Sequence, residues 1–345
     1  MSQEDRIGFK QKLGCWLYER WRAECALRPW LSSITGIRWE DLRNRGEVLE
    51  EGAAAGARVC RREWTTSLTV ARFFPRVGGR LASRAFADWP LQGEHPAPAR
   101  GDAAPSLSVI LPVGGRERLP LFRAVLDSFA KQSVSNVEVI VVEHSADAAY
   151  DEGLPPGAIY RHLPLAAGEE FNKSRLANIG VRCATAEWIL LHDADIVVPH
   201  RYVESLLGAV REGYEAVLPI RLLFYLDADA TVSFLPAKAL PAGLRVKQVS
   251  QNFPGASIAV RKDVYEALGG HNERFQGWGG EDSEFLSRLK TRRVFRGGFM
   301  PALHLWHALA PKKASGHRNQ ELLDRELAIP PAERIRQSRS LAGPA

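Results

Sequence analysis

Apolar runs of strand length alternate with segments of helical periodicity in the second two thirds of the chain. The runs cover Leu107–Pro112, Val137–Val142 and Trp188–His192, and apolar residues at helical spacing mark Leu119–Phe129 and Phe171–Val181 between them. Strands separated by helices pair in parallel through right-handed crossovers. The pattern predicts an α/β fold in which helices flank a Rossmann-like sheet.

Polar residues follow these strands directly. Pro112 ends the first strand and opens a loop that reaches Arg118, Glu143 ends the second strand, and Asp193 and Asp195 follow the third. Ligands of open α/β sheets bind beyond the carboxyl ends of the strands. These residues should therefore share one rim of the sheet, and that rim is the predicted nucleotide site.

The N-terminal region, residues 1–89, has a different pattern. Basic residues separate apolar ones that recur at helical spacing, namely Leu13, Trp16, Leu17, Trp21 and Cys25. Two interpretations stay open. One is a small helical domain whose tryptophans pack inward, and the other is a basic amphipathic surface for an anionic membrane or a partner protein.

The rest of the chain divides by composition. Residues 90–105 are rich in proline, glycine and alanine and predict a linker. Residues 106–310 then form the expected α/β domain. Residues 311–345 are expected to be a C-terminal tail, loosely ordered after about Pro330.

Composition and charge narrow the class of protein. The 345 residues carry a net charge of +6 with a pI near 9.2, which suits anionic partners such as nucleotide phosphates or acidic lipids. The basic N-terminal region has no nucleic-acid-binding motif, so no nucleic acid partner is expected. The four cysteines show no CxxC spacing, which favours incidental thiols in a reducing compartment.

The sequence also bears on location. No apolar run approaches the roughly 18 residues of a membrane span. The acidic, polar start does not resemble a secretory signal peptide. The expectation is a cytoplasmic protein that is at most peripheral to the inner face of the membrane.

The run from Gly277 to Asp282 reads Gly-Trp-Gly-Gly-Glu-Asp and carries candidate chemistry. Glycines let the backbone approach a ligand closely, and the indole of Trp278 offers a flat face to a sugar ring. The carboxylate of Asp282 could take a proton from a hydroxyl group. The run therefore predicts a sugar site that contains a general base.

A second group of residues has the chemistry of a metal site. Asp193 and Asp195 offer hard oxygen donors at a strand end, which suit magnesium or manganese beside a diphosphate. His304 and His307 lie three residues apart and could complete a mixed oxygen and nitrogen shell, which manganese accepts. The alternative interpretation is a solvated acidic loop with one packed and one surface histidine.

Four stretches of the sequence, taken in their order along the chain, resemble GT-A nucleotide-sugar glycosyltransferases. From about residue 107 to residue 307 the chain is similar to family 2-like enzymes of this kind. Its later half resembles the catalytic region of β-1,4-galactosyltransferases and of bacterial chondroitin-polymerase-type enzymes. The matching stretches are Phe171–Gly180, His192–Asp195, Gly277–Asp282 and His304–His307. The resemblance implies a GT-A nucleotide-diphospho-sugar transferase fold with a mixed sheet.

The resemblance also implies roles for single residues. The catalytic residues would be Asp282, as the base, and Glu281. Those implied for the donor and its nucleotide are Pro112, Arg116, Glu143, Phe171, Lys173 and Asp193. Those implied for acceptor and sugar are Trp278, Gly279, Gly280 and Glu281. The implied ligands of Mn²⁺ or Mg²⁺ are Asp195, His304 and His307.

The activity implied is a metal-dependent, inverting transfer of a hexose or N-acetylhexosamine, with a galactose-type sugar favoured. The donor would be a UDP-sugar and the acceptor a hydroxyl of a glycan or glycoconjugate. A retaining N-acetylgalactosaminyltransferase-like enzyme is one alternative, although such enzymes typically have Asn where this chain has Asp282. A non-catalytic sugar- or nucleotide-binding subunit is the other.

The sequence departs from the family at four places, one of which is Lys173, where the family usually has arginine. Asn252–Ser257 reads Asn-Phe-Pro-Gly-Ala-Ser where vertebrate enzymes have Tyr-Phe-Gly-Gly, which leaves the donor sugar open. Ser283 and Glu284 replace a run of acidic residues, so acceptor contacts should differ. His304 stands where vertebrate galactosyltransferases have methionine, and a histidine there should widen the choice of ion.

Overall fold

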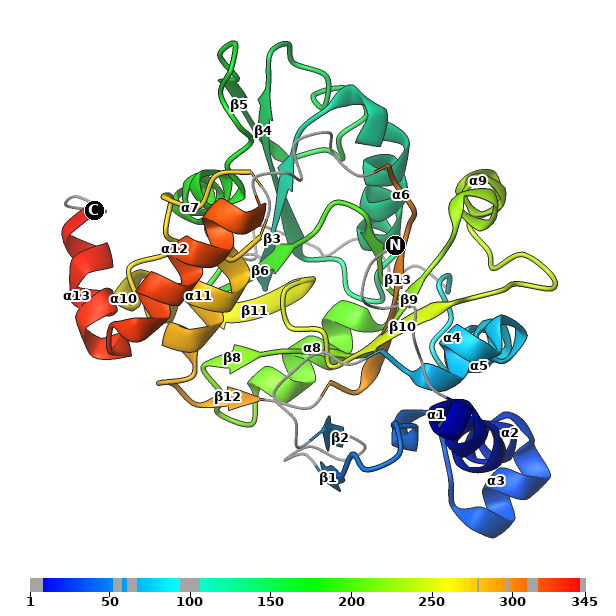
Figure 1. Cartoon of the computed structure of the whole chain (residues 1–345). Coiled ribbons are helices and arrows are strands. Elements are labelled where there is room, and N and C mark those ends of the chain that lie inside the picture. The colour runs from blue at the N-terminus through cyan, green and yellow to red at the C-terminus, as the bar shows by residue number, and fades with distance from the viewer. Residues whose placement is uncertain are drawn as a thin grey trace.

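The central sheet of the protein has a parallel block at one side. In the computed structural model, which describes residues 9–51, 58–60, 67–93, 106–277, 279–295, 298–308 and 316–341, this block has the order β6-β3-β4-β5 (Figure 1). Its strands are β3 (Leu107–Val113), β4 (Val137–Ser145), β5 (Ile159–Pro164) and β6 (Trp188–His192). Three of the four coincide with the predicted apolar runs, and β4 extends beyond its run to Ser145.

The other side of the sheet is antiparallel at its start. β11 (Ser257–Arg261) pairs antiparallel with β6, β8 (Ala216–Val217) pairs antiparallel with β11, and β12 (Val294–Phe295) pairs parallel with β8. The seven strands thus make a mixed sheet, which confirms the α/β fold class. The parallel pairing predicted from the alternation of strands and helices holds only as far as β6.

A second, four-stranded sheet brings distant segments of the chain together. Its order is β10-β9-β13-β7, with bounds β7 (Ile196–Val197), β9 (Ile220–Tyr225), β10 (Gln248–Gln251) and β13 (Met300–His304). His304 pairs with Ile196, and the Leu305 amide donates to the Asp195 carbonyl at 2.9 Å. This register places the end of β13 against the loop that follows β6.

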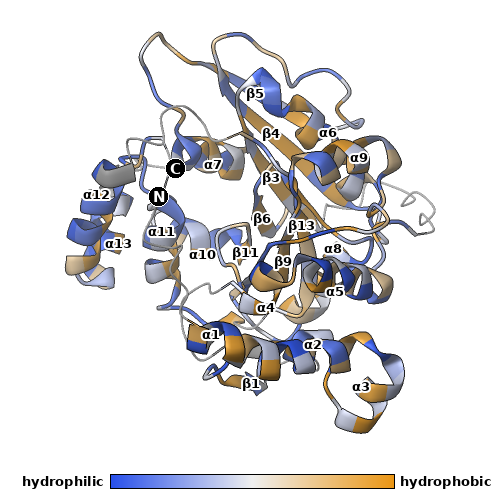
Figure 2. Ribbon diagram, turned by 45° about the vertical axis from the view of Figure 1, so that its right-hand side comes forward, coloured by the Kyte–Doolittle hydropathy of each residue, from blue (hydrophilic) through white to orange (hydrophobic). Residues whose placement is uncertain are grey.

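Helices cover both faces of the parallel block because β3 is apolar on both sides. Val109 and Leu111 share a core with α6 (Leu119–Ala130), whereas Ile110 points to the other face and shares a core with α7 (Lys173–Cys183). A Cβ at Gly180 would come within 2.4 Å of the Ile110 side chain, so α7 packs closely only with glycine there. Figure 2 shows these strands as apolar ribbons between more polar helices. The remaining helices of this part are α8 (Tyr202–Val210), α9 (Ala228–Ala237), α10 (Lys262–Ala267) and α11 (Glu281–Leu289).

The N-terminal region shares its core with the α/β domain. The Phe86 ring lies 6.0 Å from the Phe224 ring of β9, and the buried Arg221 of β9 donates to the carbonyls of Glu40 (2.8 Å) and Leu42 (2.6 Å). This region therefore depends on the second sheet for its packing. Its elements are α1 (Phe9–Gly14), α2 (Arg20–Leu27), α3 (Pro29–Thr35), β1 (Leu49–Glu51), β2 (Arg58–Cys60), α4 (Thr69–Phe73) and α5 (Pro75–Asp88), with a π-helical turn at Cys15–Glu19 and a 3-10 turn at Trp39–Asp41.

The interpretation in which the tryptophans of this region pack inward is wrong for most of them. Trp16, Trp21 and Trp30 are 54%, 55% and 60% exposed, and Trp39 alone of the described ones before residue 67 is buried. The reason is that small residues such as Ala23 fill the buried face of α2. None of the described helices is both long and apolar enough to cross a membrane, and a cytoplasmic location stays a prediction.

Most of the expected linker, residues 94–105, lies outside the described residues. Its first part packs on the domain, since the His200 amide donates to the Pro90 carbonyl at 2.8 Å. The expected tail begins with helix α12 (Gly316–Ala328), and its part after about Pro330, expected to be loosely ordered, is instead helix α13 (Pro331–Leu341). The prediction was wrong because α13 carries a buried charge, Arg334, whose partner lies on α11.

Three buried charges join α13 to α11. Glu284 accepts from Arg288 at 2.5 and 2.8 Å and from Arg334 at 2.7 Å, and all three side chains are at most 2% exposed. Glu284 lies one helical turn after Glu281, at the start of α11. The C-terminal helix therefore braces the helix that carries the candidate base.

Replacing Glu284 by alanine should lower the free energy of unfolding by about 3–5 kcal/mol, since two buried guanidinium groups lose their carboxylate. Urea denaturation followed by circular dichroism measures the loss. Glu333→Ala, an exposed glutamate on α13, is the matched control and should stay within about 0.5 kcal/mol of the wild type. Equal stabilities of the two variants would contradict the bracing role.

Candidate active site

Asp195 lies at the centre of the predicted metal site. Its carboxylate is 3.1 Å from His307 Nε2, 3.9 Å from His304 Nε2 and 3.6 Å from an Arg118 nitrogen. One ligand atom from each of Asp195, His304 and His307 lies within 4.8 Å of the others. The tertiary structure thus brings together all three predicted ligands, from the β6–β7 loop and from the end of β13.

The donor set fits a divalent cation. His307 Nδ1 lies 2.9 Å from the Ala308 carbonyl and 3.3 Å from an Arg118 nitrogen, and these contacts leave Nε2 facing Asp195. His304 stacks on Tyr225 with ring centroids 4.5 Å apart. Burial would raise the pKa of Asp195, but the bond from His307 and the nearby cationic groups outweigh it and lower the pKa to about 2. An ionised carboxylate suits manganese or magnesium, and the two imidazoles beside it favour manganese over magnesium, which takes oxygen ligands.

Lys173 joins the two other carboxylates of the site. Its ammonium lies 2.8 Å from Asp193 and 3.0 Å from Asp282. Burial lowers the pKa of Lys173, but the two carboxylates outweigh this and hold the pKa well above its ordinary value. Lys173 therefore stays a cation between the strand-end aspartate and the candidate base.

The candidate base begins helix α11. Gly280 precedes the helix with φ of 94°, a conformation that favours glycine, and Glu281 and Asp282 occupy the first turn, where the helix dipole favours carboxylates. Burial would raise the pKa of Asp282, but Lys173 and His271 hold it below its ordinary value. Burial and the neighbouring Asp282 raise the pKa of Glu281 to about 7. Glu281 Oε2 is buried and has no hydrogen-bond partner among the described residues, so it can accept from a ligand hydroxyl.

His271 is a site residue that the sequence reasoning missed. Its Nε2 lies 3.8 Å from Asp282 Oδ1, and its Nδ1 lies 2.9 Å from the Tyr265 hydroxyl. The imidazole stacks on Phe285 of α11 with centroids 4.3 Å apart. No motif marked this histidine, because its approach to Asp282 arises from packing between α10 and α11.

The Asn252–Ser257 segment, which departs from the family pattern, also lies beside the candidate base Asp282. A Cβ on Gly255 would come within 2.6 Å of Asp282 Oδ2, so the Asn252–Ser257 segment approaches the carboxylate with bare backbone. Asn252 itself has a left-handed φ of 47°. This segment therefore lines the base rather than forming a remote loop.

The residues predicted to bind the nucleotide lie at the rim of the sheet, but they differ in whether their side chains are free to contact a ligand. Val113 pairs with Glu143 across β3 and β4, so Pro112 and Glu143 lie near the carboxyl ends of these strands, although β4 continues to Ser145. The Glu143 carboxylate is fully buried and already accepts bonds from the Ser145 and Tyr160 hydroxyls and from the amides of Ala149 and Tyr150. These bonds hold the loop that follows β4 in place. A contact between Glu143 and a nucleotide stays a prediction.

Other predicted residues border the same rim. The Phe171 carbonyl accepts from the Gly277 amide at 2.8 Å, which ties the start of α7 to the glycine-rich run. Arg116 donates to the Ala148 carbonyl at 3.4 Å and is exposed. Trp278 lies outside the described residues, and Gly279 and Gly280 have φ near 95°.

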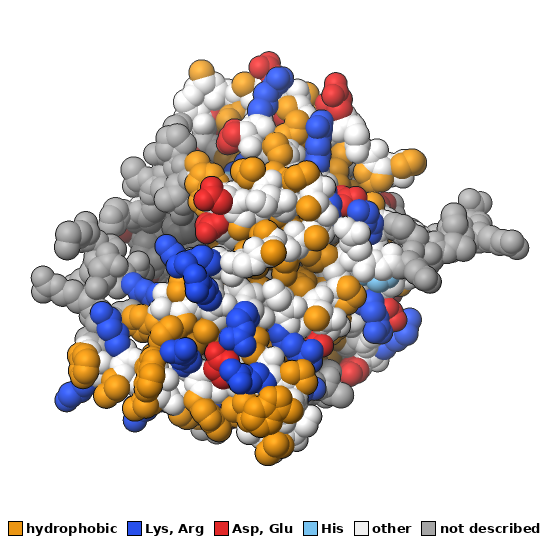
Figure 3. All heavy atoms as spheres, turned by 90° about the vertical axis from the view of Figure 1, so that its right-hand side faces the viewer, with side chains coloured by type: hydrophobic (Ala, Val, Ile, Leu, Met, Phe, Trp, Pro, Cys, Tyr) orange, Lys and Arg blue, Asp and Glu red, His pale blue; other side chains and the backbone are white. Residues whose placement is uncertain are grey.

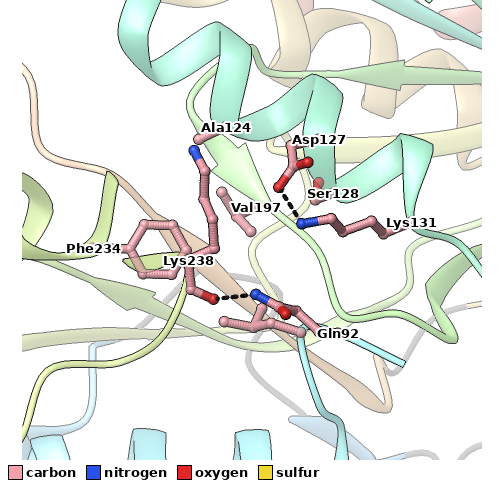
Figure 4. A pocket seen from close by; sticks show the side chains of 9 residues that line it. Gln92, Ala124, Asp127, Ser128, Lys131, Val197, Phe234 and Lys238 are labelled. Atoms are coloured by element: carbon pink, nitrogen blue, oxygen red, sulfur yellow. Dashed lines mark hydrogen bonds and ion pairs between the residues drawn. The ribbon is translucent and has the colours of Figure 1, made fainter. Parts of the chain in front are cut away.

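A small pocket elsewhere contains none of these residues. Figure 4 shows it between α6, α9 and the chain after α5, with Phe234 and Lys238 on one side and Asp127 and Lys131 on the other. Asp127 pairs with Lys131 at 2.9 Å. The candidate chemistry therefore does not lie in this pocket.

Two family profiles match the chain over the elements just described. Residues 108–269 match "Glycosyl transferase family 2", and residues 242–298 match "N-terminal domain of galactosyltransferase". The first spans β3 to α10, and the second spans the Gly277–Asp282 run and α11. Among curated proteins, none matches the sequence.

Solved structures similar to the chain include two of a Drosophila enzyme. The catalytic domain of β1,4-galactosyltransferase 7 with xylobiose is 19% identical, with 56% of this chain and 65% of that chain covered and a TM-score of 0.35. A mutant of that enzyme in complex with manganese, UDP-Gal and xylobiose is 16% identical over 62% of this chain and 80% of that one, with a TM-score of 0.37.

A third similar structure is a bacterial one. A fragment of TarS from S. aureus in complex with UDP is 15% identical, with 66% and 68% of the two chains covered and a TM-score of 0.45. The chain spans just under two thirds of the first Drosophila structure and 41% of a longer S. aureus TarS structure.

Proposed function

Residues 108–269 match the glycosyltransferase family 2 model, and on that premise we propose that the chain is a divalent-metal-dependent, inverting glycosyltransferase. It transfers a hexose or N-acetylhexosamine, galactose-type favoured, from a UDP-sugar to a hydroxyl of a glycan or glycoconjugate. The observation that carries the proposal is the meeting of Asp195, His304 and His307 on one side of the site with Lys173 and Asp282 on the other.

The side of the site that contains Asp195, His304 and His307 stabilises the leaving group. Asp195, His304 and His307 would hold Mn²⁺ or Mg²⁺, which when bound neutralises charge on a departing diphosphate. Arg118, 3.6 Å from Asp195, adds a fixed cation at the same place. Preorganised positive charge of this kind stabilises developing negative charge in the transition state.

The other side of the site moves a proton. Asp282 is ionised because its pKa is held down, so it can accept the proton of an attacking hydroxyl. Glu281, with its unpartnered oxygen, orients the acceptor by accepting a hydrogen bond from a sugar hydroxyl. An attack assisted by a carboxylate on the face opposite the leaving group inverts the anomeric centre.

Lys173 couples the two sides. Its ammonium is shared between Asp193 and Asp282, and a bound diphosphate would compete for the same cation. Loss of that ion pair raises the basicity of Asp282 when the donor is in place. The base is thus at its strongest only when there is a donor to react with.

Metal-dependent hydrolysis across a panel of UDP-sugars tests the proposal. We expect release of UDP with one or two of the panel in the presence of Mn²⁺, at a rate that falls to background in excess chelator. Addition of oligosaccharide acceptors should divert the sugar from water to a glycan product. If the protein binds UDP but releases none from any UDP-sugar of the panel, the result would favour the non-catalytic binding subunit instead.

A further inference from the structure

Helices α1 to α3 expose an apolar patch that the fold does not use. The patch, as we define it, consists of Phe9, Leu13, Trp16, Leu17, Trp21, Trp30 and Ile34. These side chains are 45–79% exposed and include most of the large exposed hydrophobic residues of the described part of the chain. Figure 3 shows hydrophobic side chains gathered on the lower part of this face, where Figure 1 places the same helices. A concentration of this kind on one surface marks an interaction site.

The packing of the region does not require the patch. The opposite face of the same helical segment buries Cys15, Ala23, Cys25 and Ala26 in the core. On the other face, Phe9, Leu13 and Leu17 follow each other at intervals of four residues, with Trp16 beside Leu17 and Trp21 four residues further on. The segment is therefore apolar on two faces, and the second one lacks a partner among the described residues.

Charge around the patch is positive. Residues 9–35 carry five cationic side chains against two carboxylates, Glu19 and Glu24. Glu19 is buried and accepts from the Arg45 amide, and Glu24 pairs with Arg80 at 3.1 Å. Lys10 and Lys12 are exposed beside the patch, and the exposed Arg28 lies 3.4 Å from Glu24. Arginines of α4 and α5 continue the positive surface, which Figure 3 shows as basic side chains above the apolar ones.

We propose that the apolar patch binds the surface of an anionic lipid bilayer. Tryptophans settle at the level of the headgroups, apolar side chains enter the edge of the acyl region, and flanking lysines and arginines attract acidic headgroups. A second copy of the chain is a poor occupant, because two like-charged rims would repel each other. This inference goes beyond glycosyl transfer and does not depend on it.

Flotation of the full-length protein with lipid vesicles tests the proposal. At low salt the protein should float with vesicles of phosphatidylglycerol mixed with phosphatidylcholine and stay behind with phosphatidylcholine alone. The bound fraction should fall as salt rises, since the Debye length is only about 10 Å at 0.1 M. The double variant Trp16→Ser/Trp21→Ser should weaken binding by about tenfold or more, because it removes two interfacial anchors.

Exposed apolar residues outside the patch supply matched controls. Val232→Ser on α9 and Leu327→Ser on α12 change side chains that are 70% and 45% exposed, and both variants should float like the wild type. Thermal unfolding checks that every variant folds. The proposal is overturned by absence of flotation at low salt, by flotation that the Trp16/Trp21 variant leaves unchanged, or by a dimer in solution that this variant dissociates.

Discussion

Replacing Asp195 by alanine should lower the rate of sugar transfer by about 10³-fold or more. The variant loses the carboxylate that lies within reach of both imidazoles and, with it, the charge that holds a divalent cation beside the leaving group. His307→Ala should have a loss of the same order, because its Nε2 is the nearest imidazole nitrogen to Asp195. Steady-state turnover with Mn²⁺, at donor concentrations well above KM, measures both.

A matched aspartate separates this effect from a general change of charge. Asp263 on α10 is exposed and pairs with Arg261 at 2.6 Å, away from the candidate residues. Asp263→Ala should therefore keep the wild-type rate. Binding of Mn²⁺ by the purified protein, measured by calorimetry without donor, should be lost in Asp195→Ala and kept in Asp263→Ala. Full turnover of the wild type in excess chelator would rule out the metal-dependent mechanism.

Asp282→Asn should lower transfer by about 10²-fold or more while donor binding stays near that of the wild type. The amide preserves the size of the side chain but cannot take the proton of the attacking hydroxyl. Turnover and donor affinity are measured separately, and the anomeric configuration of the wild-type product, read by NMR, tests inversion independently. Normal transfer by this variant would move the base to Glu281, which lies beside it.

A second variant tests which neighbour lowers the pKa of Asp282. His271→Phe keeps an aromatic ring against Phe285 but removes the polar partner of Asp282. The pKa of Asp282 should then rise, since His271 helps to hold it down. A base works only while ionised, so activity is lost as the pH falls through this pKa. The acidic limb of the pH–rate profile should therefore move to higher pH, an effect that a purely structural role of His271 would not produce.

Local patterns predicted most of the parallel block. The apolar runs that became β3 and β6 and the helical spacing that became α6 depend on neighbours within about a dozen residues, which the sequence shows directly. Asp195, His304 and His307 were found for another reason, since their chemistry and order resemble a known family. The antiparallel β11 and the order of the second sheet were not predictable, because strand pairing over long separations leaves no local signal.

The mistakes came from packing between distant segments. Arg334 looked like part of a polar tail, and only its burial against Glu284 turns that tail into a docked helix. One of the two interpretations of the N-terminal region placed its tryptophans in the core, and small residues on the opposite face fill the core instead.

The sequence by itself determined which residues are candidates for metal binding, proton transfer and sugar contact, and that Asp193 and Asp195 follow a strand of an α/β sheet. Only the tertiary structure decided that Lys173 links Asp193 to Asp282, that His271 lies against Asp282, and that Trp16 and Trp21 face outward. The physical reason is that periodicity fixes the face on which a side chain lies relative to its own helix or strand. What covers that face depends on segments a hundred or more residues away.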